Sequence, residues 1–433
     1  LVVLADSETG LGVARLTGEV GRSAFQFRLF AEALREGSYL EATIDHAGET
    51  ALGPQPEIRR MLVPIGPVAV FGSSNFPFAF SVAGGDTASA LAAGNPVVIK
   101  AHGSHPLTSR ASFDVLSAAA AAQGAPEGTI SIVYGTQSGR DLVADPRIRA
   151  VGFTGSLSAA QSLLAIIDER DTPIPFYGEL SSLNPLVITQ AAAEQRADEL
   201  AAGLFGSFTL GAGQFCTKPG IAFVPTGAAG DAVLDGLVTR SRDAQAQVLL
   251  NNRIASSFDE IRARLVTEGR ATVAVEGVAH GFTATPSVLV IEAGDLTASA
   301  TEEAFGPLVL VVRYSGLDAV YSALDCIPDS LTATILHAPA DDITALTREL
   351  APRAGRLVFN GYPTGVRVSW GQQHGGPWPA TNSLHTSVGV TAIRRFLRPL
   401  AWQNAPEAVL PPELREGAAG IPRRVDGVLT LPA

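Results

Sequence analysis

The chain has 433 residues, of which 46% are hydrophobic and 17% charged, and its formal net charge at pH 7 is -11. This composition is typical of a well-packed soluble protein, and the negative charge without a basic cluster argues against a nucleic-acid partner. No apolar run is long enough to cross a membrane.

From residue 66 onward, short apolar segments alternate with helical ones. Strands are predicted at 66–72, 96–100, 130–135 and 149–155, separated by helices at 79–93, 106–123 and 156–169. Further strands are predicted at 219–225, 286–292, 308–314, 331–337 and 355–359. Val/Ile-rich runs that alternate with helices are typical of parallel sheets covered on both faces. The predicted fold class is therefore α/β with two domains that meet near residue 180. Residues 39–62 interrupt the pattern as a polar β segment, and the tail after 396 ends in a strand-like segment.

The two cysteines, Cys216 and Cys326, are too few for a disulfide framework, which favours a reducing cytoplasm. The seven histidines form no ligand pattern, so we predict no metal. Cys216 lies in the glycine-flanked loop GAGQFCTKPG, although a structural cysteine usually lies in an apolar run. Taken alone it is either structural or a nucleophile, which requires a thiolate-stabilising site.

Because the chain starts at Leu1 and not at a methionine, we expect the native N-terminus to be longer.

Five ordered stretches carry a family resemblance. They are FGSSNFPFAFSVAGGDTASALAAGNPVVIKAH (71–102), VGFTGS (151–156), GELSSLNP (178–185), GQFCTKPG (213–220) and EEAFGPL (302–308). In this order they resemble the aldehyde dehydrogenase superfamily over nearly the whole chain. Within it, GQFCTKPG, ELSSLNP and the HGGPWPATNS stretch are most similar to the α-ketoglutaric semialdehyde dehydrogenase branch.

The resemblance implies three catalytic residues. Cys216 would attack the aldehyde carbon, Asn75 would bind the oxyanion of the thiohemiacetal, and Glu179 would activate the water that hydrolyses the thioester. Relatives that pass the acyl group to coenzyme A generally lack this glutamate, so we expect a non-acylating enzyme that releases a carboxylic acid. The alternative for Asn75 is a turn residue. A catalytically silent binding or structural protein on the same fold would be expected to have lost one of the three.

The resemblance also implies a nicotinamide cofactor. NAD-preferring members carry a glutamate three residues after the ribose-binding lysine, and Gly103 stands at that position. We therefore expect NADP to be accepted and preferred, with NAD possible; the alternative is that Gly103 is only a turn residue. The predicted cofactor-binding residues are Lys100, His102, Gly103, Ser104, Arg140, Gly155, Ser156, Glu303 and Phe305.

The branch resemblance implies 2,5-dioxopentanoate, the semialdehyde of α-ketoglutarate, as the substrate. Its distal carboxylate needs a cation, since an unpaired desolvated carboxylate is costly. The predicted substrate-binding residues are Phe76, Phe208, Phe215 and Arg367. Arg367 is the candidate for the carboxylate; its alternative is a solvent-facing arginine. Aromatic walls would equally suit a long-chain fatty aldehyde, which stays an alternative. Lys218 either lowers the pKa of Cys216 or is a solvated loop residue.

The resemblance finally implies a domain organisation. Residues 1–38 and 63–180 would form the dinucleotide-binding domain and residues 181–393 the catalytic domain. Residues 39–62 and 394–433 would form an oligomerisation hairpin and a C-terminal arm. An unpaired edge strand there would be a liability in a monomer, so we expect a homodimer or homotetramer.

Overall fold

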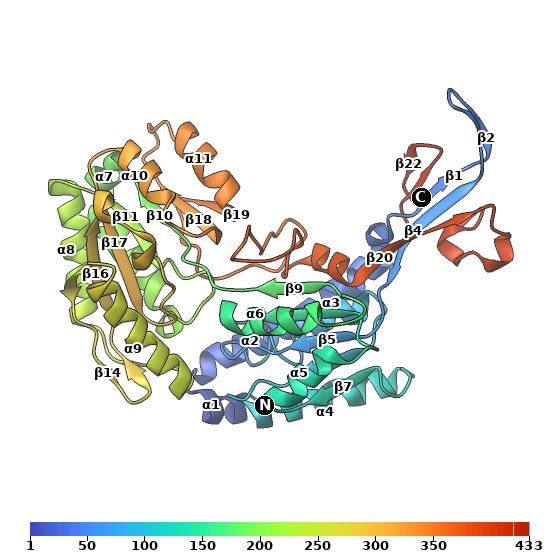
Figure 1. Cartoon of the computed structure of the whole chain (residues 1–433), viewed down its shortest axis with the longest axis horizontal. Coiled ribbons are helices and arrows are strands. Elements are labelled where there is room, and N and C mark those ends of the chain that lie inside the picture. The colour runs from blue at the N-terminus through green and yellow to red at the C-terminus, as the bar shows by residue number, and fades with distance from the viewer. Residues whose placement is uncertain (419, 433) are drawn as a thin grey trace.

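Two mainly parallel sheets form the body of the molecule, and a smaller sheet forms an arm that projects from it (Figure 1). The computed structural model describes residues 1–418 and 420–432. Both parallel sheets lie where the sequence predicts alternating strands and helices, which confirms the α/β class. Among the described helices, none has both the length and the apolar character needed to cross a membrane.

The first sheet has five parallel strands in the order β7-β6-β5-β8-β9. They are β5 (Val68–Phe71), β6 (Val97–Lys100), β7 (Ile130–Val133), β8 (Ala150–Thr154) and β9 (Phe176–Glu179). The helices around them are α1 (Val2–Thr9), α2 (Val13–Glu36), α3 (Gly85–Ala92), α4 (Pro106–Ala122), α5 (Thr136–Ala144) and α6 (Leu157–Asp168). The strand order reverses at β5, so the carboxyl ends of β5, β6 and β8 form the edge where such sheets bind ligands.

Strand β5 shows why the first sheet is buried on both faces. Val68 and Val70 pack with α2, α3 and α4 on one side, whereas Ala69 and Phe71 pack with α5 and α6 on the other. Successive side chains of a strand point to opposite faces, so a strand covered twice must be apolar at every position. Each fully buried aliphatic or aromatic side chain contributes about 1.5–3 kcal/mol.

The second sheet has seven strands in the order β13-β16-β17-β11-β10-β18-β19, and only β13 runs antiparallel to its neighbour. They are β10 (Leu186–Ile188), β11 (Ile221–Pro225), β13 (Thr272–Val275), β16 (Ser287–Glu292), β17 (Leu308–Tyr314), β18 (Ser330–Leu336) and β19 (Ala354–Phe359). Helices α7 (Gln190–Thr209) and α8 (Ala228–Arg242) pack on one face. The other face is covered by α9 (Asn252–Thr267), α10 (Leu317–Leu324) and α11 (Thr344–Leu350). A small sheet of β12 (Gln247–Val248), β14 (Ala279–His280) and β15 (Thr283–Ala284) lies apart.

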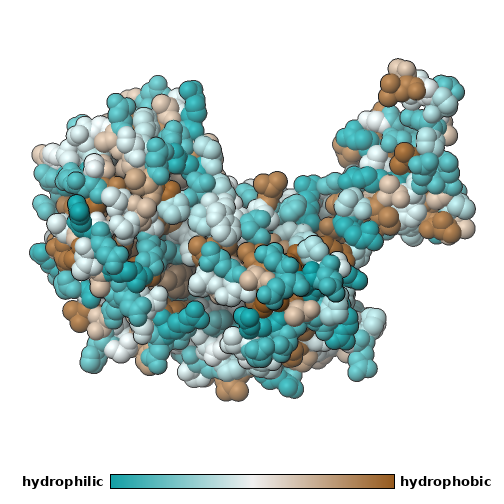
Figure 2. All heavy atoms as spheres, viewed as in Figure 1, coloured by the Kyte–Doolittle hydropathy of each residue, from teal (hydrophilic) through white to brown (hydrophobic). Residues whose placement is uncertain are grey.

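The arm is built from segments that are far apart in the sequence. Its sheet has the order β20-β4-β1-β21-β22, with β20 (Leu397–Gln403), β4 (Ile58–Pro64), β1 (Thr43–Asp45), β21 (Arg423–Val425) and β22 (Val428–Thr430). A hairpin of β2 (Gly48–Thr50) and β3 (Gly53–Gln55) forms its tip. Apolar side chains are exposed on this arm (Figure 2), and Leu52, Val428, Leu429 and Leu431 are among them.

The segment after β19 returns from the second sheet to the first. It runs antiparallel to the end of β9, where Thr381 pairs with Glu179, and the Asn382 side chain accepts a hydrogen bond from Gly178 N and donates one to Phe176 O, both 2.8 Å. The 3-10 helix η6 (Val390–Phe396) then joins the same core as α3 and β5. Residues 381–393, which the sequence analysis assigned to the catalytic domain, thus pack against the first sheet.

Candidate active site

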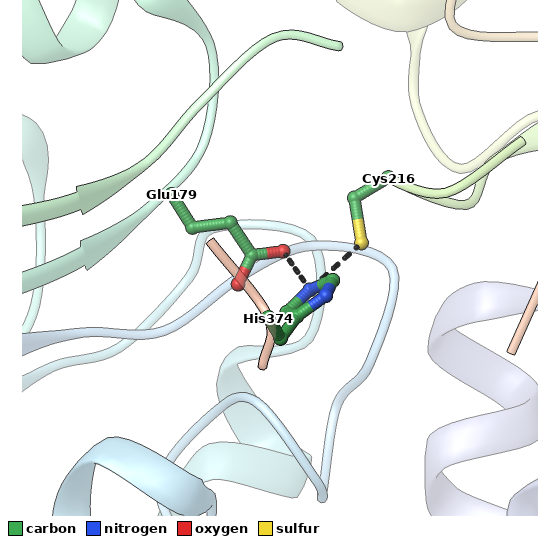
Figure 3. Close-up of side chains that lie close together, drawn as sticks. All are labelled: Glu179, Cys216 and His374. Carbon is green, nitrogen blue, oxygen red and sulfur yellow. Dashed lines mark hydrogen bonds and ion pairs between the residues drawn. The ribbon is translucent and has the colours of Figure 1, made fainter. Parts of the chain in front are cut away.

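Three chemically active side chains meet between the two parallel sheets (Figure 3). His374 lies between Cys216 and Glu179: its Nε2 is 2.8 Å from Glu179 Oε1 and 3.5 Å from Cys216 Sγ. A carboxylate only accepts hydrogen bonds, so Nε2 carries the proton. The imidazole therefore joins a thiol from one sheet to a carboxylate from the other.

Glu179 is the last residue of β9 and is only 2% exposed. Both of its carboxylate oxygens have partners, because Ser387 Oγ donates to Oε2 at 2.7 Å. Burial raises the pKa of Glu179, but the charge and hydrogen bond of His374, together with the hydrogen bond of Ser387, outweigh it and lower the pKa overall. Glu179 is thus held as a carboxylate, the form that a general base requires.

The loop that carries Cys216 follows a tight turn at the end of α7. Gly211, Ala212 and Gly213 have successive φ values of 59°, 58° and 67°, all left-handed. A Cβ on Gly213 would lie 2.2 Å from Gly306 O, so this position requires glycine. Burial raises the pKa of the Cys216 thiol, as do the charges of Glu179 and Glu303, whereas Arg22 lowers it. The resting thiol is therefore protonated and must lose its proton before it attacks.

Two buried residues, Asn184 and Lys218, anchor the backbone of this loop through hydrogen bonds. Asn184 donates to Cys216 O at 2.8 Å and to Lys218 O at 2.9 Å. Lys218 is 1% exposed and donates to the carbonyls of Ala304, Gly306 and Leu308 at 2.7, 3.1 and 3.1 Å. Lys218 is therefore not a solvated loop residue; it joins the loop before β11 to the loop before β17. Burial lowers its pKa to about 8, opposed by the charge of Glu303.

Asn75 lies in the loop after β5 and is 7% exposed. Its Nδ2 donates to Gln214 O at 2.9 Å, which directs the amide toward the Cys216 loop and occupies one of its two N–H groups. Arg15 fixes the backbone of the same residue by donating to Asn75 O at 2.6 Å. The second N–H of Asn75 remains for a substrate oxygen.

An aromatic wall lies beside these residues. Phe76 packs against Phe80 and Phe215, with ring centres 5.1 and 5.2 Å apart, and Phe80 faces His374 at 6.4 Å.

Phe208, a predicted substrate contact, is instead fully buried in the core between α7 and the second sheet, so it has no surface to offer a substrate. Arg367 is exposed, and it forms no hydrogen bond or ion pair with a described residue.

The predicted cofactor residues lie mostly at the carboxyl edge of the first sheet. Lys100 ends β6, and the exposed Gly155 and Ser156 follow β8, where Ser156 caps α6 by accepting from Ala159 N at 3.3 Å. The free N–H groups at the start of α6 fit a phosphate. A Cβ on Gly103 would meet nothing within 4 Å, so the space at this position is open.

The remaining cofactor candidates are spread over three elements. His102 accepts from Ser104 N at 3.1 Å, and burial with the charges of His105, Lys100 and Arg253 lowers its pKa to about 3. Arg140 is exposed on α5. Glu303 accepts from Ser182 N at 3.1 Å and lies close enough to Cys216 to affect its pKa, and Phe305 is half-buried two residues later.

The thiol, imidazole and carboxylate also form a possible metal-ligand set. One ligand atom each from Cys216, His374 and Glu179 lie within 4.8 Å of one another. The prediction of no metal rested on sequence spacing, and this cluster could not be seen that way because its members lie on three separated segments. Cysteine and histidine are ligands that suit Zn²⁺.

Comparisons with known proteins give a consistent result. The sequence profile described as "Aldehyde dehydrogenase family" matches residues 1–378. The chain is 44% identical to alpha-ketoglutaric semialdehyde dehydrogenase 2 of Azospirillum brasilense, over 99% of the chain and 83% of that protein. It is 41% identical to alpha-ketoglutaric semialdehyde dehydrogenase of Acinetobacter baylyi over the same shares. The fold matches that of aldehyde dehydrogenase 21 from Physcomitrella patens with a TM-score of 0.78 at 21% identity, over 94% of this chain and 82% of that one.

Proposed function

The chain belongs to the aldehyde dehydrogenase family, and we propose that within it the protein oxidises α-ketoglutaric semialdehyde to the carboxylic acid with NADP, without transfer to coenzyme A. The observation that carries the chemistry is the meeting of Cys216, His374 and Glu179 between the sheets, with the Asn75 amide directed toward the Cys216 loop. The observation that carries the substrate is the identity of 41–44% to two α-ketoglutaric semialdehyde dehydrogenases over 99% of the chain.

In the first half-reaction the Cys216 thiol loses its proton to solvent and its sulfur adds to the aldehyde carbon. The proton on His374 Nε2, 3.5 Å from the sulfur, stabilises the developing thiolate. The oxyanion of the thiohemiacetal accepts from the free N–H of Asn75 and from Cys216 N. Each such donor contributes about 3–4 kcal/mol in comparable sites. Loss of a hydride from the thiohemiacetal carbon then gives the Cys216 thioester; when bound, the nicotinamide would supply the acceptor for this hydride.

In the second half-reaction water hydrolyses the thioester. Glu179 removes the proton from this water, and its bonds to His374 and Ser387 hold the carboxylate in place while it does so. The released proton leaves Glu179 before the next turnover, and the product is the free acid. A catalytically silent protein would have no need to bring these groups together. A long-chain fatty aldehyde is less well supported, because cations lie buried in the aromatic wall.

The cofactor preference rests on the open space at Gly103. Solved structures that share the fold include an NADP-dependent enzyme from E. coli and an NAD-dependent aldehyde dehydrogenase from Sinorhizobium meliloti, so the fold alone does not decide it. No carboxylate stands at position 103 to repel a 2′-phosphate. His102 is neutral at pH 7 because its pKa is about 3, so the positive charge must come from Lys100, Arg140 and Arg253.

The ratio of kcat/KM for NADP to that for NAD tests this preference. It should exceed one, and Gly103→Glu, which meets no steric obstacle, should invert it. A strong preference of the wild-type enzyme for NAD would refute it.

Assembly and location are also proposals. Family members are typically oligomeric, and the apolar side chains on the arm support a homodimer or homotetramer. Cys216 and Cys326 are free thiols, which supports the reducing cytoplasm.

The reaction itself is tested with two variants. Cys216→Ala should abolish reduced-nicotinamide formation but retain cofactor binding, since the sulfur is not a cofactor ligand. Glu179→Gln should release one equivalent of reduced cofactor in a burst and then turn over slowly. Wild-type turnover in either variant would contradict the assigned roles.

A further inference from the structure

Helix α2 presents a row of polar side chains to the loop that carries Asn75. Arg15, Glu19, Arg22 and Gln26 follow one another at intervals of four, three and four residues, which places them on one face. Glu19 Oε1 accepts from Phe78 N at 2.7 Å and Ala79 N at 3.0 Å, and Gln26 donates to Ala79 O at 3.2 Å. This face of α2 therefore points into the protein, toward the oxyanion site.

The two arginines of this row stack on the aromatic wall. The Arg22 guanidinium lies 5.0 Å from the ring centre of Phe80 and 6.0 Å from that of Phe76. The Arg15 guanidinium lies 4.9 Å from the ring centre of Phe215 and 5.2 Å from that of Phe76. These rings border the catalytic residues, since Phe76 follows Asn75 and Phe215 precedes Cys216.

Neither guanidinium has its hydrogen-bonding capacity filled. Nε and Nη2 of Arg22, and Nε and Nη1 of Arg15, are shielded from solvent without a partner among the described residues. Arg15 makes one bond, to Asn75 O, whereas Arg22 makes none with a described residue. Burying an unpaired cation is costly, so an arginine in this state is suited to an anion that arrives from outside.

The charge of the group selects the kind of anion. Burial raises the pKa of Glu19, and the hydrogen bonds from Phe78 N and Ala79 N and the charges of Arg15 and Arg22 oppose this rise. When Glu19 is ionised, Arg15, Glu19 and Arg22 together carry a charge of +1, which one carboxylate neutralises. Arg22 is also near enough to Cys216 and Glu179 for their charges to act on it. A carboxylate on Arg22 would therefore belong to a short molecule whose other end reaches the sulfur.

We propose that Arg22, supported by Arg15, binds the distal carboxylate of the substrate and sets the preference for short ω-carboxylated aldehydes. A guanidinium provides a planar fork that matches both oxygens of a carboxylate, and a neighbouring keto oxygen accepts from the second arginine. Arg22 replaces the exposed Arg367 as the residue that recognises this group. This inference rests on the proposed aldehyde dehydrogenase activity and identifies the determinant of its substrate class.

The test compares two aldehydes of equal length, 5-oxopentanoate and pentanal, through the ratio of their kcat/KM values. In the wild-type enzyme the charged substrate should be preferred by at least about tenfold. Arg22→Met should reduce this ratio at least tenfold, and Arg15→Met should reduce it less. Arg28→Met, on the exposed face of the same helix, is the matched control and should leave the ratio unchanged.

Each outcome separates the hypotheses. If Arg22→Met lowers kcat/KM for both substrates in proportion, Arg22 stabilises the Cys216 thiolate or the fold, and the inference is wrong. A wild-type ratio near one would contradict both the proposed semialdehyde substrate and the proposed carboxylate site. It would not contradict the proposed oxidation of aldehydes. If Arg22→Met does not fold, Arg22→Lys decides: it retains the charge but loses the fork, so an undiminished ratio would overturn bidentate recognition.

Discussion

Replacing His374 by alanine tests whether the imidazole acts through Glu179 or through Cys216. His374 and Glu179 are 1% and 2% exposed, and their nitrogen and oxygen lie 2.8 Å apart, so the variant removes a charge-assisted hydrogen bond in a dry site. Such bonds contribute about 1.5–3 kcal/mol, which corresponds to about a 10- to 150-fold loss of rate if the bond is fully used in the transition state. The contact with Cys216 Sγ is longer, at 3.5 Å. We therefore expect deacylation to suffer more than acylation.

The pH dependence gives a second readout of the same variant. His374 lowers the pKa of Glu179, so the carboxylate stays ionised as the pH falls below the usual glutamate range. Without the imidazole, burial is opposed only by the weaker partners, the pKa rises, and the acid limb of kcat should move toward neutral pH.

Stopped-flow measurement of reduced nicotinamide separates the two steps. In His374→Ala the first-turnover burst should persist while the steady rate falls, and His280→Ala, an exposed histidine of β14, should match the wild-type enzyme. A steady rate within twofold of wild type, or a lost burst with an unmoved acid limb, would refute the assignment to Glu179.

Three further predictions follow from the structure. Asn184→Ala leaves the carbonyls of Cys216 and Lys218 without a donor, so urea unfolding should show a loss of about 2–4 kcal/mol; a loss below about 0.5 kcal/mol would mean that the loop does not depend on this side chain. Light scattering should find a dimer or tetramer, and the pair Leu429→Glu and Leu431→Glu on the arm should weaken it, whereas a wild-type monomer at micromolar concentration would contradict the assembly. Zn²⁺ should inhibit by binding Cys216, His374 and Glu179, with recovery on adding EDTA, and EDTA alone should not reduce the rate; inhibition by EDTA would indicate a required metal.

The parts of the structure that local patterns determine were predictable from the sequence. The strands at 66–72 and 96–100 are Val/Ile-rich and end in turns, and they form β5 and β6. Family motifs also predicted catalytic roles for Cys216, Glu179 and Asn75. The structure places Cys216 and Glu179 beside His374 and directs the Asn75 amide toward the Cys216 loop, and the three catalytic roles stay predictions.

Contacts across long sequence separations were not predictable in this way. His374 meets Glu179 and Cys216 across 195 and 158 residues, so no spacing rule connects them. Arg22 lies on a polar face of α2. Because polar helix faces usually contact solvent, the sequence pattern gives no sign that this face is buried. Only the packing of α2 against the loop of Asn75 shows that this face points inward. The same holds for Lys218, whose carbonyl partners lie 86–90 residues further on.

The division of the catalytic groups between two sheets has a mechanical consequence. Glu179 ends a strand of one sheet, and Cys216 precedes a strand of the other. A small rotation of one domain against the other therefore changes the distance between the proposed base and the proposed nucleophile, although every residue in each domain keeps its own neighbours. Misplacement by about 1 Å can lower a rate about 100-fold. Turnover in this enzyme thus reports the relative orientation of its domains, and a substitution at a remote inter-domain contact can slow the chemistry without touching the active site.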